Sequence, residues 1–502
     1  MTSRSPRIPV IDVFAGPGGL SEGFWRTGRF DIRLSIEKDV HAYQTLKLRS
    51  FVHQFRYLHA PDSYYRLLSG QIQADQLYKM YPDKAAVAAK RTWLAELGSA
   101  SCTNETVDRR IEEALQDNHD DPWILLGGPP CQAYSLVGRS RRRNDPSFEE
   151  DPRHVLYQQY LRIIARHSPP AFVMENVTGI LTTKLDGTLL FPHILEDLAD
   201  PGHALGVTSC GRYHLFSLRD DDLDQIAGSL GNYVVRAEDY GIPQARHRVI
   251  IVGVREDIEV DPLKLCKNSV RTTVGDAIDD LPPLRSRLSK EKDGSSEWLH
   301  CLRDMTHDPW FTSMHDHHLR SEIRSNLARL NAAPRRPGGC PMPEPLSAWI
   351  RDKRIPVPPN HEARSHMRAD LWRYFYAATF ASVRGESPDI RDFPDGLWPL
   401  HANLQDGTGE LVFTDRFRVQ LHGQPATTVT SHISKDGHYY IHPDPLQCRS
   451  LTVREAARLQ TFPDNYLFCG PRTEQYHQVG NAVPPLLAYQ IALAVSHVFK
   501  SD

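Results

Sequence analysis

Short apolar runs alternate with longer stretches of helical periodicity through the first half of the chain. Each run is four to seven residues long and largely apolar along its length, which is typical of strands buried on both faces. Long connections separate the runs, and this spacing favours parallel strands joined by helices. We therefore predict an α/β domain with a doubly wound, mostly parallel sheet. Its strands are expected at 9–14, 31–36, 123–126, 171–174, 233–237 and 248–254.

The pattern changes after residue 284. Residues 285–448 are rich in proline, arginine and histidine and show few periodic segments, so we interpret them as a smaller α+β domain. Helical periodicity returns at 451–462 and again at 486–499. We expect residues 449–502 to return to the first domain.

The first domain, residues 1–284, contains one long stretch without a clear strand pattern. Residues 51–120 are a mixture of aromatic residues, alanine and charged residues, and we interpret them as an insertion. A helix is expected around 85–97, where alanine and charged residues dominate. The sequence does not assign a role to this insertion.

The composition is that of an ordinary globular protein of more than one domain. The chain has 502 residues, 40% of them hydrophobic and 24% charged, and a formal net charge of −3. It contains no run of the roughly 20 apolar residues that a membrane helix needs, and its start lacks the apolar core of a secretory signal. Eight cysteines without a C-x-x-C pair favour neither a disulfide framework nor a zinc finger. We expect a cytoplasmic protein with no membrane contact.

A glycine-rich turn follows the first predicted strand. In DVFAGPGGLSEGF, residues 12–24, Gly16, Gly18 and Gly19 stand between the strand and a helix start. Such a turn lets the backbone approach a nucleotide-like ligand closely, although these glycines do not form a full G-x-G-x-x-G. The next apolar run ends in Glu37, at the distance where an acidic side chain commonly binds ribose hydroxyls. The two features together indicate an adenosine-containing cofactor.

One cysteine follows two prolines at the end of a predicted strand. In LLGGPPCQAYS, Pro129 and Pro130 fix φ at two positions and remove two amide donors just before Cys131. A lone cysteine is usually a buried hydrophobe. Open α/β sheets, however, bind their ligands at the carboxyl ends of strands, where this thiol is expected. We therefore predict that Cys131 is a nucleophile.

Two other strand ends bring polar side chains to the same edge. Glu175 and Asn176 follow the run at 171–174, and QARHR, residues 244–248, leads into the run at 248–254. Alternation predicts that Gln244, Arg246 and Arg248 share one face. Each motif alone is compatible with a solvated strand end. Together with the thiol they provide a nucleophile, an acid and an anchor for a carbonyl oxygen.

The motifs as a set resemble those of the DNA (cytosine-5)-methyltransferase family. DVFAGPGG, Glu37, GGPPCQAYS, ENV, QARHR, LTVREAARLQTFPDNY and QVGNAVPP occur in the family's order and at compatible spacings. The resemblance extends over residues 9–49, 123–284 and 411–497. The segment between QARHR and LTVREAARLQ stands where the family has its variable target-recognition domain. The expected fold is accordingly a class I methyltransferase, a Rossmann-like fold.

The resemblance implies transfer of a methyl group from S-adenosylmethionine to C5 of a flipped-out cytosine in duplex DNA, leaving S-adenosylhomocysteine. Cys131 would add to C6 as a thiolate. Glu175 would donate a proton to N3 from a protonated carboxyl group, and Asn176 would fix the turn. Arg248 would hold the cytosine O2, with the other two polar residues of QARHR as braces. No metal is implied.

The same resemblance implies the cofactor contacts. They come from the first loop, the acid after the second strand, the proline turn and the C-terminal motif: Phe14, Ala15, Gly16, Gly18, Gly19, Glu37, Pro129, Asn481, Ala482 and Val483. Asp12 is expected to shape the turn, and Leu126 is a further candidate for the pocket wall. The acidic residue that the family places beside adenine has no clear match, and Asp108 is a candidate for it.

An arginine-rich loop follows Cys131. A cytosine inside a duplex is out of reach of any thiol, so the base must be flipped out and the distorted backbone held. We expect the loop at 133–152 to close over DNA, with Ser135 or a neighbour filling the vacated stack. A solvated basic loop is the alternative. The arginines expected on phosphates are Arg139, Arg141, Arg142 and Arg143.

The second domain is expected to read base edges. Residues 415–443 combine basic, hydroxyl and amide side chains suited to phosphates and bases. Residues 360–380 also mix basic and aromatic side chains in a helical pattern, and we expect the apolar set Leu371, Tyr374, Phe375 and Ala378 to be core. The histidines between 300 and 318 match no usual zinc spacing, so we predict no metal site there.

Three alternatives share some of these features. A tRNA cytosine-5 methyltransferase would use the same catalytic set, but the long segment before LTVREAARLQ favours duplex DNA. A thymidylate-synthase-like enzyme also uses a cysteine beside proline, yet it would not need the glycine loop or QVGNAVPP. A catalytically silent DNA-binding protein is the third. We expect a monomer that acts in restriction-modification or host defence, with a cognate restriction endonuclease or defence proteins as partners.

Overall fold

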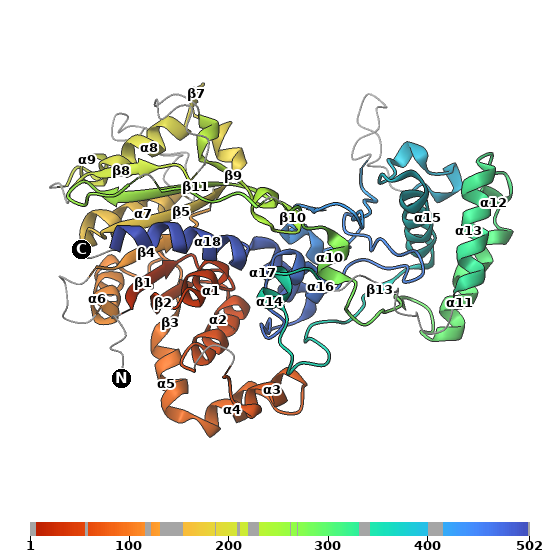
Figure 1. Ribbon diagram of the computed structural model, residues 1–502, viewed down its shortest axis with the longest axis horizontal. Helices are drawn as coiled ribbons and strands as arrows, with labels where there is room; N and C mark the ends of the chain where they lie inside the picture. Colours follow the sequence, from red (N-terminus) through yellow and green to blue (C-terminus); the bar gives the residue numbers. More distant parts are fainter. Residues whose placement is uncertain are drawn as a thin grey trace.

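The structure is a computed structural model of the chain. Figure 1 shows a sheet domain, a helical domain and a middle region of loops and short helices that joins them. The described residues are 7–55, 59–115, 122–130, 154–185, 187–207, 211–218, 230–261, 263–268, 270–330, 342–399 and 415–499.

An eight-stranded sheet organises the first domain. Its strands lie in the order β3-β2-β1-β4-β5-β11-β8, and β9 pairs with β11 beside this path. The first five run parallel, whereas β11 is antiparallel to β5, β8 and β9. The direction of winding reverses between β1 and β4, so a crevice for ligands is expected there. The strands are β1 (Ile8–Val13), β2 (Phe30–Glu37), β3 (Thr92–Leu94), β4 (Ile124–Gly127), β5 (Ala171–Val177), β8 (Tyr213–Phe216), β9 (Val234–Arg236) and β11 (His247–Arg255).

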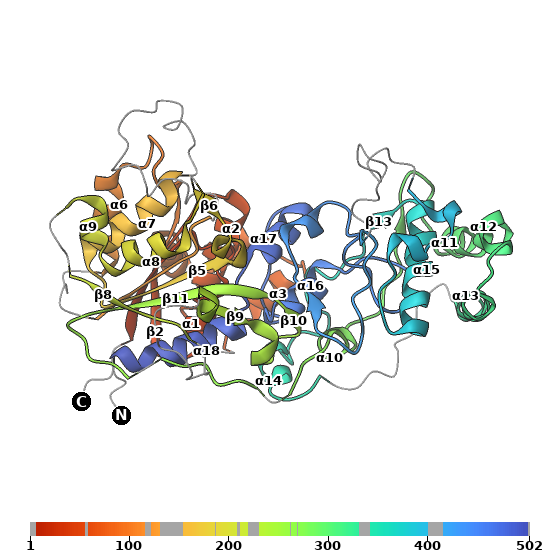
Figure 2. The ribbon, with the colours of Figure 1, turned by 90° about the horizontal axis from the view of Figure 1, so that it is seen from above.

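Helices cover both faces of the sheet (Figure 2). On one face, α1 (Gly19–Arg26) and α18 (Pro485–Val495) pack over a core that includes Val10. On the other face, α6 (Asn104–Leu115), α7 (His154–His167) and α8 (Phe191–Ala199) enclose a core that includes Ile11. Burial on both faces explains why the strands are apolar throughout. The predicted doubly wound α/β fold is confirmed.

The segment that we interpret as an insertion contributes one strand to this sheet. β3 pairs with β2 in parallel at Ser35 and Thr92, and α6 packs beneath the sheet. The helix predicted around 85–97 is wrong at its end, because α5 (Pro82–Arg91) stops where β3 begins. Thr92 and Trp93 favour a strand, and the open edge of β2 supplies the partner. The rest of the segment forms α3 (Asp62–Leu68) and α4 (Ala74–Met80), which with α5 and α2 (Val40–Val52) share a small core.

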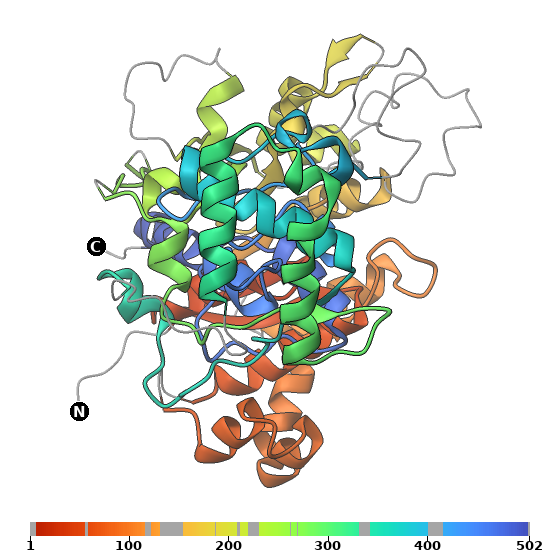
Figure 3. The ribbon, with the colours of Figure 1, turned by 90° about the vertical axis from the view of Figure 1, so that its right-hand side faces the viewer.

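The second domain is built from helices (Figure 3). Its core brings together α11 (Ser295–Arg303), α12 (Pro309–Thr312), α13 (His317–Arg329) and α15 (Arg368–Arg384). The set predicted as core on α15 is confirmed, since its side chains are buried: Leu371, Tyr374, Phe375 and Ala378. Among the described residues, its named strands are short, such as β12 (Arg287–Leu288) paired with β13 (Ser365–His366).

Residues 342–364, which stand between α13 and α15 in the sequence, lie against the sheet domain. We name residues 342–364 the strap; it contains α14 (Leu346–Ile350). Met342, Leu346 and Ile350 form a small apolar cluster against which Leu486 of α18 packs. The sequence pattern assigned these residues to the second domain and gave no sign of this docking.

The C-terminal residues return to the sheet domain through α16 (Val453–Leu459), α17 (Arg472–Asn481) and α18. The helical stretch Arg472–Phe499 is long and apolar enough to cross a membrane by length and composition alone. The protein buries 67% of its most apolar window, however, and α18 packs on α1 in the core. Such burial is typical of a core helix in a folded domain.

Candidate active site

The glycine turn after β1 has the backbone conformation that glycine favours. Gly16 and Gly18 have φ values of 55° and 93°, and Phe14 adopts φ 56° at the strand end. The Gly18 N–H donates to the Ala15 carbonyl at 3.0 Å, which closes the turn before α1. No atom lies within 4 Å of the place where a Cβ of Gly16 would stand. The turn therefore has open space in front of Gly16.

Glu37 lies at the carboxyl end of β2, beside that space. Its Oε2 accepts from the Gly16 N–H at 2.8 Å, and its Oε1 accepts from the N–H groups of Lys38 and Asp39 at 2.9 and 2.8 Å. Burial raises the pKa of Glu37, and these backbone donors oppose the rise. Glu37 thus holds the glycine turn while its carboxylate keeps acceptor capacity for a hydroxyl group.

The C-terminal motif packs directly on the start of α1. A Cβ on Gly19 would lie 2.1 Å from the Val483 carbonyl oxygen, and one on Gly23 would lie 2.5 Å from the Pro485 carbonyl oxygen. Ala482 and Val483 are buried, whereas Asn481 is exposed, with its amide 3.4 Å from His477 Nδ1. Predicted cofactor residues from opposite ends of the chain therefore meet.

Asp12 lies beneath the turn. The Ser21 hydroxyl donates to Asp12 Oδ2, and Oδ1 is buried without a hydrogen bond. Burial raises the pKa of Asp12 to about 7, although the Ser21 hydrogen bond opposes this. Asp12 joins β1 to the first turn of α1, in agreement with the expectation that it shapes the turn.

Glu175 and Arg248 face each other across two neighbouring strands. β11 runs antiparallel to β5 there, with Arg248 opposite Val177. The Arg248 Nε lies 2.9 Å from Glu175 Oε1, and its NH1 donates to the His247 carbonyl at 2.7 Å. Both side chains are mostly buried but keep a small exposed fraction, 14% for Glu175 and 11% for Arg248. The structure thus brings together two predicted catalytic residues that are 73 positions apart, from 175 to 248.

Asn176 joins this pair to residues 128–130, which we name the stem of Cys131. Its Nδ2 donates to the Pro129 carbonyl at 2.7 Å, and its Oδ1 accepts from the Val177 N–H at 2.9 Å. A Cβ on Gly128 would lie 3.2 Å from Glu175 Oε2, so the chain passes close to that carboxyl group. The last described residues before Cys131 are therefore fixed beside Glu175.

Gln244 and Arg246 are buried away from solvent and bind backbone. The Arg246 N–H donates to the Gln244 carbonyl at 2.9 Å, which interrupts the strand between β10 (Gln244–Ala245) and β11. A single alternating face is therefore not formed through QARHR. Gln244 binds the Val429 N–H and the Leu459 carbonyl, and Arg246 donates to the carbonyls of Val429 and Gly480. These contacts fit the predicted bracing role.

Burial, with Arg248 adding to it, lowers the pKa of Arg246 to about 9. The side chain is still cationic at neutral pH. It holds the chain that returns from the second domain, at Val429, against α17 at Gly480. A Cβ on Gly480 would stand 2.3 Å from the Thr430 carbonyl carbon, which shows how closely the two backbones approach.

Several predicted site residues lie outside the described residues. They are the nucleophile and the members of the arginine-rich loop: Cys131, Ser135, Arg139, Arg141, Arg142 and Arg143. Their roles stay predictions. Leu126 is described, and its side chain belongs to the core under α1 and α18.

Asp108 is engaged between two helices. Its Oδ1 accepts from Arg162 NH1 at 2.7 Å and lies 3.0 Å from His167 Nε2, which ties α6 to α7. Glu96 follows β3 at the carboxyl edge of the sheet, where the preceding Ala95 N–H donates to the Glu37 carbonyl at 2.9 Å; the Glu96 side chain is half exposed and pairs with the exposed Lys38 at 3.0 Å. Because the sequence pattern did not predict β3, it did not single out Glu96 as a residue at a strand end. An acid three residues after a β-branched and aromatic pair, Thr92 and Trp93, was the available signal.

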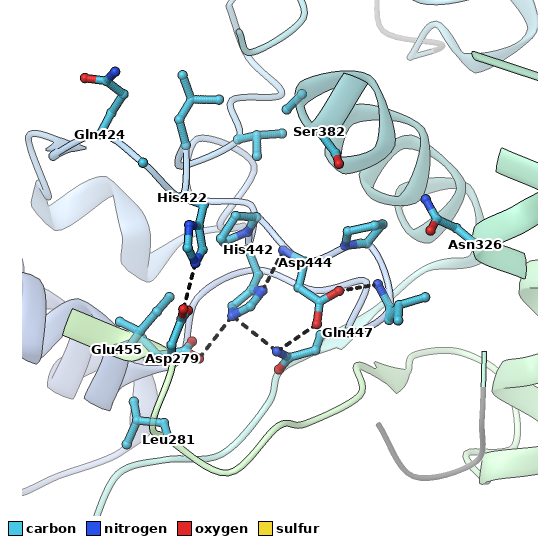
Figure 4. Close-up of a pocket in the computed structure, with 18 of the residues that line it drawn as sticks. Asp279, Leu281, Asn326, Ser382, His422, Gln424, His442, Asp444, Gln447 and Glu455 are labelled. Atoms are coloured by element: carbon cyan, nitrogen blue, oxygen red, sulfur yellow. Dashed lines mark hydrogen bonds and ion pairs between the residues drawn. The ribbon is translucent and has the colours of Figure 1, made fainter. Parts of the chain in front are cut away.

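A second cavity is separate from this site. It has a volume of about 910 Å³ and lies where the middle region meets α13 and α15. Figure 4 shows His442 among Asp444, Gln447 and Glu455, and His422 against Asp279 at 2.7 Å. None of the described catalytic or cofactor residues lines it.

Buried histidines near this junction make the stability of the protein sensitive to acid. Burial, with nearby Arg364, lowers the pKa of His366 to about 3, and burial with Arg449 lowers that of His442 to about 4. Both are neutral in the folded protein and take up a proton in the unfolded chain below pH 6.5, so folding loses stability as pH falls from 6.5 toward those values. Each histidine is expected to lower the free energy of unfolding by about 2 kcal/mol as the pH falls from 6.5 to 5. Urea unfolding of the wild type and His366→Gln at several pH values checks this, and an equally steep loss in the variant contradicts it.

The geometry defines a class of protein. A doubly wound sheet, a glycine turn and a strand-end acid at the winding reversal, with the C-terminal helix folded back on them, define a class I methyltransferase. The family model of the C-5 cytosine-specific DNA methylases matches residues 89–497. The chain therefore belongs to this family and is a DNA cytosine-5-methyltransferase.

Relatives match over nearly the whole chain. M.Bpa9945I, a type II methyltransferase of Bacillus paralicheniformis, is 35% identical over 509 residues, covering 98% of this chain and 99% of that protein. M.DdeI, a type II methyltransferase of Desulfomicrobium norvegicum, is 26% identical, covering 98% of this chain and 89% of that protein. A solved structure of a prophage-encoded E. coli protein has a TM-score of 0.51 at 20% identity, covering 98% and 100% of the two chains, and shows likeness of fold.

Proposed function

We propose that this protein transfers a methyl group from S-adenosylmethionine to C5 of a flipped-out cytosine in a specific duplex DNA sequence, by transient addition of Cys131 to the base. One arrangement, built from two contacts, supports this assignment above the others. The Glu175–Arg248 pair and the Pro129–Asn176 hydrogen bond fix an acid and a cationic anchor beside the stem of that cysteine.

The residues of the crevice fit S-adenosylmethionine. The open space before Gly16 admits a ligand close to the backbone, and the Glu37 carboxylate lies where ribose hydroxyls can donate to it. Glu96, after β3, is our candidate for the acid beside adenine, in place of Asp108. Phe14 and Val483 would complete the apolar wall. When bound, S-adenosylmethionine supplies an electrophilic methyl group.

The chain's own residues make cytosine C5 nucleophilic. The Cys131 thiolate adds to C6 and forms an S–C bond, while Glu175 donates a proton to N3 and Arg248 holds O2. C5 then takes the methyl group. A base removes the C5 proton, the S–C6 bond breaks with its electrons returning to the Cys131 sulfur, and the ring recovers its 5,6 double bond as the N3 proton returns to Glu175. Two successive prolines and the Asn176 hydrogen bond to the Pro129 carbonyl fix the backbone just before Cys131, so less entropy would be lost at the addition step.

The second domain supplies target recognition in this proposal. Residues 415–430 bring it back beside Arg246, and the arginine-rich loop after Cys131 would close over the DNA. We propose that the protein acts as a monomer in the cytoplasm. The relatives named type II methyltransferases support a role in restriction-modification with a cognate endonuclease.

Covalent trapping tests the mechanism. Bisulfite sequencing of host DNA with and without the protein first identifies the methylated cytosine. A duplex with 5-fluorocytosine at that position then retains the enzyme, because C5 has no proton to lose after methylation. We expect a stable adduct with S-adenosylmethionine for the wild type and no adduct for Cys131→Ala.

Cys266→Ala is the matched control, since Cys266 is exposed and distant from the motif. It should trap as the wild type does. An adduct formed by Cys131→Ala would contradict the proposed nucleophile. An adduct on tRNA alone would identify the tRNA alternative, and none with cofactor present would identify a silent DNA-binding protein.

A further inference from the structure

The strap is anchored on the helices that form the cofactor crevice. The Trp349 indole N–H donates to the Thr461 carbonyl at 2.8 Å, and its ring lies 5.2 Å from that of Tyr489 on α18. The guanidinium of Arg26, at the end of α1, lies 4.0 Å from the indole centroid and donates to the Trp349 carbonyl at 2.9 Å. A segment of the variable region is thus fixed to the sheet domain.

Asp352 is a buried carboxylate of the strap. Its Oδ2 accepts from the Tyr65 hydroxyl at 2.7 Å and from the Asn465 amide at 3.0 Å, and its Oδ1 accepts from the Arg354 N–H at 3.0 Å. The residue is 7% exposed. A buried carboxylate with three donors fixes the groups that it binds, because leaving any of them unpaired is costly.

Asn465 connects Asp352 to α1, the helix that follows the glycine turn. Its carbonyl accepts from the Tyr64 hydroxyl at 2.6 Å, and its Oδ1 accepts from Arg49 NH1 at 3.2 Å. Arg49 in turn binds the buried Glu22 of α1 through two nitrogens, at 2.7 and 2.6 Å. Burial would raise the pKa of Glu22, but Arg49 and His53 hold it well below its usual range.

The next residue, Tyr466, contacts the turn itself. Its hydroxyl donates to the Pro17 carbonyl, between Gly16 and Gly18. A Cβ on Gly18 would stand 3.0 Å from that hydroxyl and 2.8 Å from Leu46. The turn therefore rests on Tyr466, and the loop that contains Tyr466 is fixed by Asp352.

We propose that Asp352 is a positioning residue for S-adenosylmethionine, acting through Asn465 and Tyr466 on the glycine turn. The inference rests on the proposed cofactor site and assigns to the variable region a part in building it. Without the Asp352 carboxylate, the loop at 463–466 loses one buried acceptor and the Pro17 carbonyl is less firmly held. The glycine turn then spends part of its time in conformations that do not fit the ligand. The apparent affinity falls in proportion to the population of the conformation that still fits.

Calorimetric binding of S-adenosylhomocysteine without DNA tests the proposal on the full chain. We expect Asp352→Ala to weaken binding by about 10-fold, the size of one hydrogen bond to a charged group. Glu362→Ala is the matched control, because Glu362 is exposed on the same strap and pairs with Arg472 at 3.3 Å. It should change the affinity by less than about twofold.

Tyr466→Phe keeps the buried ring and removes only the hydroxyl on Pro17, so it decides the question even if Asp352→Ala fails to fold. We expect a KM for S-adenosylmethionine raised about fivefold, with kcat and DNA affinity unchanged, since one neutral hydrogen bond is lost. The double variant Asp352→Ala/Tyr466→Phe should lose less binding free energy than the sum of the losses in the two single variants, because both residues act on the same turn.

Wild-type affinity in a folded Asp352→Ala, or in Tyr466→Phe, would overturn the positioning role. Failure of the wild type to bind S-adenosylhomocysteine would instead overturn the proposed cofactor. A general loss of packing would lower DNA affinity together with cofactor affinity, and this result also counts against the inference.

Discussion

Glutamine in place of Glu175 is expected to lower kcat for cytosine methylation by about 10³-fold. The amide has no proton of suitable acidity for N3, and it pairs poorly with the Arg248 guanidinium that now lies 2.9 Å from the carboxylate. DNA affinity should change little, because in the proposed mechanism Glu175 contacts the flipped base and not the phosphates. Single-turnover methylation with saturating DNA and S-adenosylmethionine measures the chemical step.

Glu238→Gln is the matched control for that change. Glu238 is also buried beside β11, but it binds His247 Nε2 at 2.7 Å and not Arg248. The same carboxyl-to-amide exchange there is expected to cost less than about 10-fold in kcat, because it acts only through packing. Equal losses in the two variants would show that Glu175 has no special part in the reaction.

Alanine at position 19 is expected to weaken S-adenosylhomocysteine binding by about 100-fold and to lower the free energy of unfolding by about 2–3 kcal/mol. The added Cβ would stand 2.1 Å from the Val483 carbonyl oxygen, a backbone atom that cannot rotate away. α1 and the C-terminal motif must therefore separate, and both contribute to the crevice. Calorimetry and urea unfolding measure the two effects.

Gly423→Ala is the control for the glycine substitution. A Cβ on Gly423 would have no atom within 4 Å, so the variant should bind and unfold as the wild type does. Unchanged S-adenosylhomocysteine binding in Gly19→Ala would show that the contact between α1 and the C-terminal motif does not shape the cofactor crevice.

The strand ends were predictable because their signal is local. A strand buried on both faces must be apolar along its length, so the first polar residue after it marks the edge of the sheet. Glu37 and Glu175 were found in this way, and the structure places Glu175 next to Arg248. Proline and glycine restrict or free the backbone at single positions, which made the turns at Gly16 and before Cys131 readable as well.

Errors arose where a neighbour in space decides the outcome. Residues 92–94 lie within the stretch expected to be a helix, and they form β3 instead, because Thr92 and Trp93 favour a strand and β2 has an open edge beside them. Asp108 has the right charge for a ligand but lies where Arg162 and His167 use it. Side-chain charge is a property of the residue, whereas its partner is a property of the fold.

The sequence by itself predicted the class of sheet and the glycine turn, and it singled out Cys131, Glu175 and Arg248 as candidates for the site, because each depends on backbone preference and on residue type at a strand end. The tertiary structure alone decided that Gln244 and Arg246 bind the backbone of Val429, and that Asp352 binds the side chain of Asn465. Those contacts join residues more than 100 positions apart. No local periodicity records them, since only the packing of the folded chain brings such groups within hydrogen-bond distance.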